Sequence, residues 1–78
     1  MKLSERIEAS EVYRVKHSKT GNTYYIWDIS EHTETGELMV TYLQDDNALK
    51  LWVRPLAMFD DSVEVDGEMV PRFVSDHT

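Results

Sequence analysis

Two short runs of this sequence place an arginine next to an aromatic residue. Trp52 and Arg54 form the first pair, and Arg72 and Phe73 form the second. A guanidinium beside an aromatic ring can stack on a planar group or hold a carboxylate through two hydrogen bonds. A small β-domain can bring two such pairs to one surface, and aromatic grooves of this kind recognise peptides. We therefore interpret Trp52, Arg54, Arg72 and Phe73 as a candidate binding surface.

The strand that carries the first pair also has an apolar face. Alternation along residues 49–54 separates Leu51 and Val53 from Trp52 and Arg54. We expect Leu51 and Val53 to fill the core, which leaves the tryptophan and the arginine together on the opposite face.

A structural role for the same pair is the alternative interpretation. In that case Trp52 packs beneath a following helical turn, as buried tryptophans in very small domains usually do. Arg54 then forms an ion pair with Asp60 or Asp61.

His32, Glu34 and Glu37 bring an imidazole close to two carboxylates, which are ligands for divalent metals. Their spacing matches no metal-ligand pattern, and a hairpin tip leaves such side chains in water. We predict that they bind no metal and that His32 forms hydrogen bonds within its own turn.

The sequence favours a non-catalytic protein and predicts no catalytic, cofactor-binding or metal-binding residues. It has no cysteine, which excludes thiolate chemistry and disulfides. Its serines, histidines and acids form no recognisable nucleophile or phosphate-binding motif. A site assembled in space from distant residues remains an open alternative.

Charge is distributed unevenly along the chain, whose net charge is -7. Residues 1–24 carry five basic and three acidic side chains, whereas the remainder carries three basic and twelve acidic ones. This balance repels a phosphate backbone and favours a partner with a basic surface, unless the acids serve only solubility. A nucleic-acid interface would require Arg14, Lys16, Arg54 and Arg72 to converge on one acid-free face.

Alternating segments separated by turn residues predict a mainly β domain, a small antiparallel barrel or sandwich. The turns contain glycine or side chains that favour tight bends, and no internal repeat is apparent. The expected strands cover residues 12–17, 23–30, 38–43, 49–54, 63–65 and 68–70, and the expected turns cover 18–22, 34–36, 45–47 and 66–67.

Two further segments stand apart from this alternation. Ser4 can cap a short helix near the start of the chain. Pro55 must end a strand, and we expect one helical turn to follow it at residues 56–59. Leu56, Met58 and Phe59 are too apolar to stay in water, so this turn should fold back and close one end of the barrel.

We expect one domain over residues 1–78, with an extension at 1–11, the barrel at 12–74 and a frayed tail at 75–78. No apolar run is long enough to span a membrane, and the N-terminal residues are charged where a signal peptide is apolar. We therefore expect a cytoplasmic protein that does not engage membranes. A domain this short has a thin stability margin, which is compatible with a homodimer.

Several segments together are similar to one known family. They are His32–Glu37, Leu51–Phe59, Val63–Gly67 and Pro71–Phe73. The chain resembles the bacterial domain-of-unknown-function 1653 family from about Tyr13 to Phe73. The resemblance implies a small SH3-like antiparallel β-barrel with one short helical turn and no assigned activity.

These observations favour a non-catalytic module that binds a protein or peptide partner without a cofactor. Two other hypotheses remain open. One is a small-molecule sensor or minor enzyme that uses the same tryptophan and arginine face, and the other is a nucleic-acid binder, which the net charge disfavours.

Overall fold

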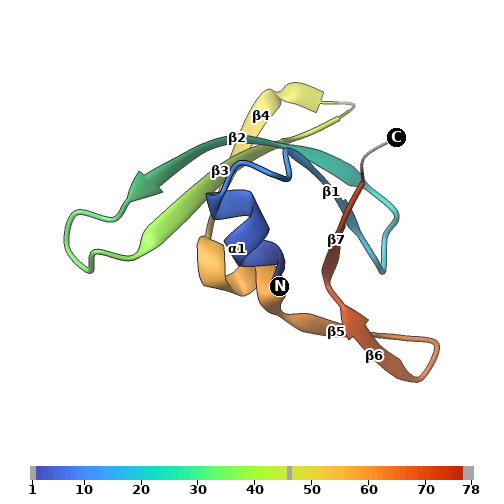
Figure 1. Cartoon of the computed structure of the whole chain (residues 1–78). Coiled ribbons are helices and arrows are strands. Elements are labelled where there is room, and N and C mark those ends of the chain that lie inside the picture. The colour runs from blue at the N-terminus through green and yellow to red at the C-terminus, as the bar shows by residue number, and fades with distance from the viewer. Residues whose placement is uncertain (1, 46, 77–78) are drawn as a thin grey trace.

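The computed structural model of the protein describes residues 2–45 and 47–76 (Figure 1). Strands dominate, and two short helical segments accompany them. In chain order the elements are α1 (Leu3–Glu8), β1 (Arg14–His17), β2 (Thr23–Glu31), β3 (Leu38–Gln44), β4 (Asn47–Pro55), the 3-10 helix η1 (Leu56–Asp60), β5 (Ser62–Val65), β6 (Glu68–Pro71) and β7 (Phe73–Ser75).

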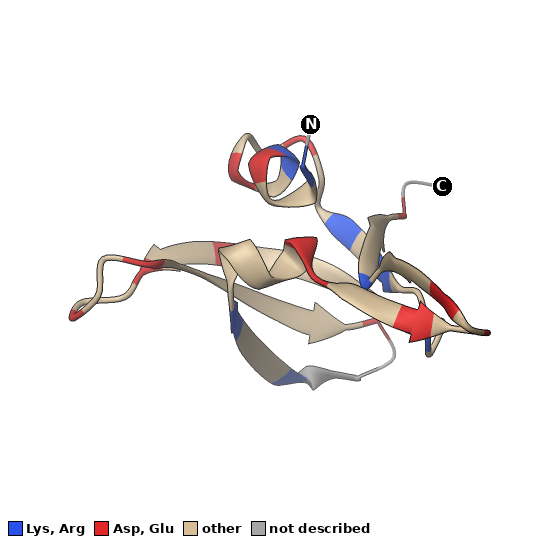
Figure 2. Ribbon diagram, turned by 90° about the horizontal axis from the view of Figure 1, so that it is seen from below, with Lys and Arg blue, Asp and Glu red and all other residues tan. Residues whose placement is uncertain are grey.

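All strand pairings are antiparallel, and they form two sheets. The larger sheet has the order β4-β3-β2-β1-β7, and β5 pairs with β6 in a separate hairpin. The prediction of a mainly β fold is confirmed. Over the described residues β4 and β7 form the two edges of the large sheet. Figure 2 shows α1 lying over one face of this sheet.

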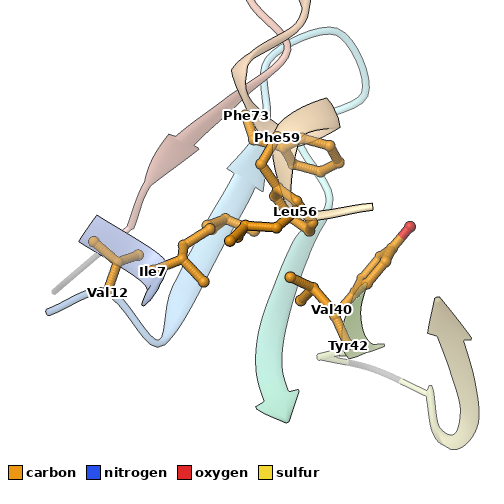
Figure 3. Close-up of a cluster of buried hydrophobic side chains, with 8 residues drawn as sticks. Ile7, Val12, Val40, Tyr42, Leu56, Phe59 and Phe73 are labelled. Carbon is orange, nitrogen blue, oxygen red and sulfur yellow. The ribbon is translucent and has the colours of Figure 1, made fainter. Parts of the chain in front are cut away.

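The core lies between this face and the helical segments, and its members come from almost every part of the fold (Figure 3). Aliphatic side chains from α1, β1 and β3 meet aromatic rings from β3, η1 and β7. The buried residues are Ile7, Val12, Val15, Val40, Tyr42, Leu56, Phe59 and Phe73. These side-chain contacts join both edges of the large sheet to the helical segments.

The turn after Pro55 folds back as predicted, but only part of it is buried. Leu56 and Phe59 enter the core, and Phe59 has no exposed surface. Met58 is 41% exposed, so the expectation that it leaves water is wrong. A 3-10 helix of this length turns Leu56 and Phe59, three residues apart, toward the same side and points Met58 away.

Ser4 serves a different purpose from the predicted helix cap. It lies inside α1, and its backbone N–H and hydroxyl donate hydrogen bonds of 3.0 and 2.6 Å to the Asp60 carboxylate. At the start of the helix the Lys2 N–H donates to the Glu5 carboxylate. The serine therefore attaches α1 to η1, a contact between residues far apart in sequence.

The predicted strands match the structure closely, and one strand was not predicted. The Asp66-Gly67 hairpin forms with Val63 opposite Val70, as expected. Strand β7 was missed because it has three residues and no alternation long enough to signal it. Residue 46 in the predicted turn at 45–47 and residues 77 and 78 of the predicted tail lie outside the described residues.

Replacing Phe59 with alanine should destabilise the protein by about 3–5 kcal/mol, the usual cost of truncating a buried phenylalanine. Met58→Ala is the matched control, because that side chain belongs to the same turn and is 41% exposed. Its cost should be well under half as large. Chemical denaturation of both variants measures the difference, and equal losses of stability would contradict the burial of Phe59.

Candidate functional site

The side chains of β4 that face the core are the ones predicted from the sequence to lie on the outer face. Trp52 lies opposite Tyr42 and Arg54 lies opposite the buried Val40, which puts this pair on the core side of the sheet. Leu51 and Val53 point outward and are 56% and 61% exposed. Apolar character alone could not assign the faces, since both contain large hydrophobic groups; the pairing with β3 decides them.

Arg54 lies over the aromatic core. Its guanidinium carbon is 5.3 Å from the centre of the Phe73 ring, and its Nε donates a 3.4 Å hydrogen bond to the Tyr42 hydroxyl. The predicted ion pair with Asp60 or Asp61 is not among the contacts of the described residues. Asp60 instead accepts hydrogen bonds from Ser4.

Arg72 is fixed through its backbone next to the same ring system. Its N–H donates to the Asp61 carbonyl at 2.7 Å, and its carbonyl accepts from the Ser18 N–H at 2.8 Å. The Nε of its side chain is buried and has no hydrogen-bond partner among the described residues. Two hydrogen bonds therefore fix the backbone of Arg72, whereas the Nε of its side chain donates none among the described residues.

His17 joins these residues, although sequence reasoning did not single it out. It pairs with Phe73 across β1 and β7, and the two rings meet edge to face with centres 5.1 Å apart. Burial and the nearby charges of Arg72 and Arg54 lower the pKa of His17 below its usual 6.5. The His17 ring and the Arg54 guanidinium therefore both lie against the Phe73 ring.

Trp52 extends this group from Arg54 toward the beginning of β4. It is 40% exposed, it shares a strand face with Arg54, and the Lys50 ammonium lies 4.5 Å from the centre of its ring. We call His17, Trp52, Arg54, Arg72 and Phe73 the basic-aromatic face. Of the four predicted surface residues, Trp52 and Arg54 share a strand face and Arg54 lies over the Phe73 ring, but Phe73 is itself buried in the core.

A repeated turn motif could have drawn attention to His17. His17-Ser18-Lys19-Thr20-Gly21 and His32-Thr33-Glu34-Thr35-Gly36 share the pattern His-x-x-Thr-Gly, which corrects the expectation of no internal repeat. In each turn the histidine Nδ1 accepts two backbone N–H groups, and the glycine has a φ near +75°. This φ favours glycine over any residue with a side chain.

The local hydrogen bonds predicted for His32 are thereby confirmed. Its Nδ1 accepts from the N–H groups of Glu34 and Thr35 at 3.2 and 3.4 Å. A nitrogen used in this way cannot at the same time ligate a metal. That His32, Glu34 and Glu37 bind no metal stays a prediction.

The basic residues do not converge on one acid-free face. Arg14 forms ion pairs with Asp45 and Asp76, and the hydrogen bond from Thr23, followed by the charge of Arg14, lowers the pKa of Asp45. Arg14 and Lys16 alternate with the buried Val15 and so face away from the core. The arrangement required for a nucleic-acid interface is absent from the described residues.

The cavities lie away from the two arginines of the basic-aromatic face. A cavity of about 420 Å³ separates α1 from β7, and another of about 280 Å³ lies beside β2. Neither is lined by Trp52, Arg54 or Arg72. Of these three residues Trp52 is exposed, whereas Arg54 and Arg72 are half-buried.

The fold and this surface define a small, mainly β domain that carries a cluster of cationic and aromatic side chains. Residues 11–75 match the family model described as a protein of unknown function, DUF1653, and the chain belongs to that family. No curated protein and no solved structure matches the chain. Within the described residues no helix is long and apolar enough to cross a membrane.

The lowered pKa of His17 predicts a pH dependence of stability. Because the folded protein holds this proton less tightly than the unfolded chain does, the stabilisation is complete above pH 6.5 and is lost as the pH falls below that value. Denaturation at a series of pH values between 7.5 and about 5 measures the slope. His17→Gln should reduce this slope.

His32→Gln is the matched control, since it changes the equivalent acceptor in the second turn of the same kind. It should retain the slope of the parent protein. If both variants flatten the profile equally, or neither does, the lowered pKa of His17, caused by its burial and by the nearby arginines, does not govern stability in this pH range.

Proposed function

We propose that this protein is a non-catalytic binding module of the bacterial cytoplasm whose basic-aromatic face engages an acidic segment of a protein or peptide partner. The observation that carries the proposal is the group of Arg54, Arg72 and His17, brought together around Phe73 without a carboxylate partner among the described residues.

The charges of the whole chain make this group unusual. The chain has fifteen acidic residues against eight basic ones, so there are enough carboxylates for every arginine to form an ion pair. Figure 2 shows acidic residues on α1, on the 32–37 loop and on the β5–β6 hairpin, whereas the charged residues of β4 are basic. Like charges held together oppose folding, and an incoming carboxylate relieves that repulsion.

The form of the surface favours a peptide over a small molecule. Arg54 and Arg72 offer planar donors that can hold a carboxylate, and Trp52 offers an exposed ring for apolar atoms beside it. Small ligands usually bind in concave cavities, and the two cavities described above are lined by none of these three residues. An extended segment suits an open face better.

The pairing of Arg14 argues against the nucleic-acid hypothesis. Phosphate backbones are held by several unpaired cations along one surface. Arg14 is already engaged by Asp45 and Asp76, on a different face from Arg54.

Selection of binders from a random peptide library should enrich sequences rich in aspartate and glutamate. Binding of an enriched peptide, measured by calorimetry, should weaken at least tenfold in Arg54→Gln, which corresponds to about 1.4 kcal/mol. Glutamine can still donate to the Tyr42 hydroxyl while removing the charge. Arg72→Gln should act in the same direction.

Lys16→Gln is the control, because this lysine is exposed on the other side of the sheet. It should leave the affinity within twofold of the parent value, about 0.4 kcal/mol. Enrichment of neutral or basic peptides, or equal losses in Lys16→Gln and Arg54→Gln, would contradict the proposal.

A further inference from the structure

A second group of exposed aromatic side chains lies on β2, outside the basic-aromatic face. The pairing of β2 with β3 shifts between Ile26, opposite Tyr42, and Asp28, opposite Thr41. Trp27 is the extra residue of this β-bulge and has no partner on β3. Its side chain is 69% exposed, more than any other large hydrophobic side chain in the described part of the chain.

The bulge borders a cavity of about 280 Å³. Ile7, Val12 and Ile26 contribute apolar lining from three different segments, and Ile7 and Val12 are themselves buried. Tyr13, Trp27 and Asp28 also line it. The Ile26 N–H donates a 2.8 Å hydrogen bond to the Tyr13 carbonyl, which joins the two segments that carry the aromatic residues.

The lining has the composition of a site for an organic cation. It contains two aromatic residues, one carboxylate and no basic residue. The negative faces of aromatic rings attract ammonium groups, and a carboxylate adds a charge of the required sign. The Asp28 Oδ1 accepts a 2.8 Å hydrogen bond from the Ile29 N–H, so the backbone orients this carboxylate.

We propose that the pocket formed by Tyr13, Trp27 and Asp28 binds the alkylammonium group of a lysine side chain from a protein partner. The apolar lining accommodates the methylene groups, and the rings and the carboxylate receive the charge. The net charge of -7 assists the approach of a basic partner. This site is independent of the basic-aromatic face, since it uses β2 and the segment after α1.

The test is a titration with lysine blocked at both its backbone ends, followed through the indole N–H signals of Trp27 and Trp52 in NMR spectra. The matched probe is blocked norleucine, which has the same methylene chain without the charge. Lysine should shift the Trp27 signal saturably with a millimolar dissociation constant, and norleucine should not. Sodium chloride at equal ionic strength serves as the blank.

The variant Asp28→Asn removes the charge but keeps the local hydrogen bond, because the asparagine oxygen can still accept from the Ile29 N–H. It should weaken lysine binding about threefold, within the range of an exposed ion pair. The proposal is overturned if lysine causes no saturable shift, if both probes bind equally, if Trp52 responds in place of Trp27, or if Asp28→Asn binds as the parent does.

Discussion

The contact between the rings of Phe59 and Phe73 is the constraint on which the rest of the structure depends. Their centres are 5.0 Å apart with a tilt of 35°, and both side chains are buried. Phe59 belongs to η1, which follows the edge strand β4, and Phe73 begins β7 at the other edge. The contact of the two rings therefore connects the segment that follows one edge strand with the other edge strand.

The same rings position the candidate binding surface. Tyr42 meets Phe59 edge to face, and His17 meets Phe73 in the same way. Arg54 contacts one ring of each pair. Its guanidinium lies over Phe73, and its Nε donates a hydrogen bond to the Tyr42 hydroxyl. The Arg54 guanidinium is therefore held by the aromatic core itself. The proposed binding role and the stability of the fold share residues here, and only substitutions that keep the rings separate the two.

Local chemistry in the sequence was sufficient to predict every strand except β7, the hairpin turns at 34–36 and 66–67, and the burial of Phe59. Asp66-Gly67 and the break at Pro55 are signals that operate within a few residues, and both were interpreted correctly. Residues that depend on partners far along the chain were not predictable in this way. The orientation of Trp52 depends on pairing with Tyr42, Ser4 depends on Asp60, and the proximity of His17 to Arg54 requires β7 to lie beside β1.

A double-mutant cycle with Phe59→Leu and Phe73→Leu tests the central claim most directly, because leucine keeps each site apolar and removes only the contact between rings. The free energy of unfolding is measured for the parent, both single variants and the double variant. The account predicts that the two single-variant losses, added together, exceed the loss in the double variant by about 0.5–1.5 kcal/mol. This difference is the usual coupling energy of an aromatic pair. Strictly additive losses would contradict it, since each ring would then stabilise its own segment without joining the two edges.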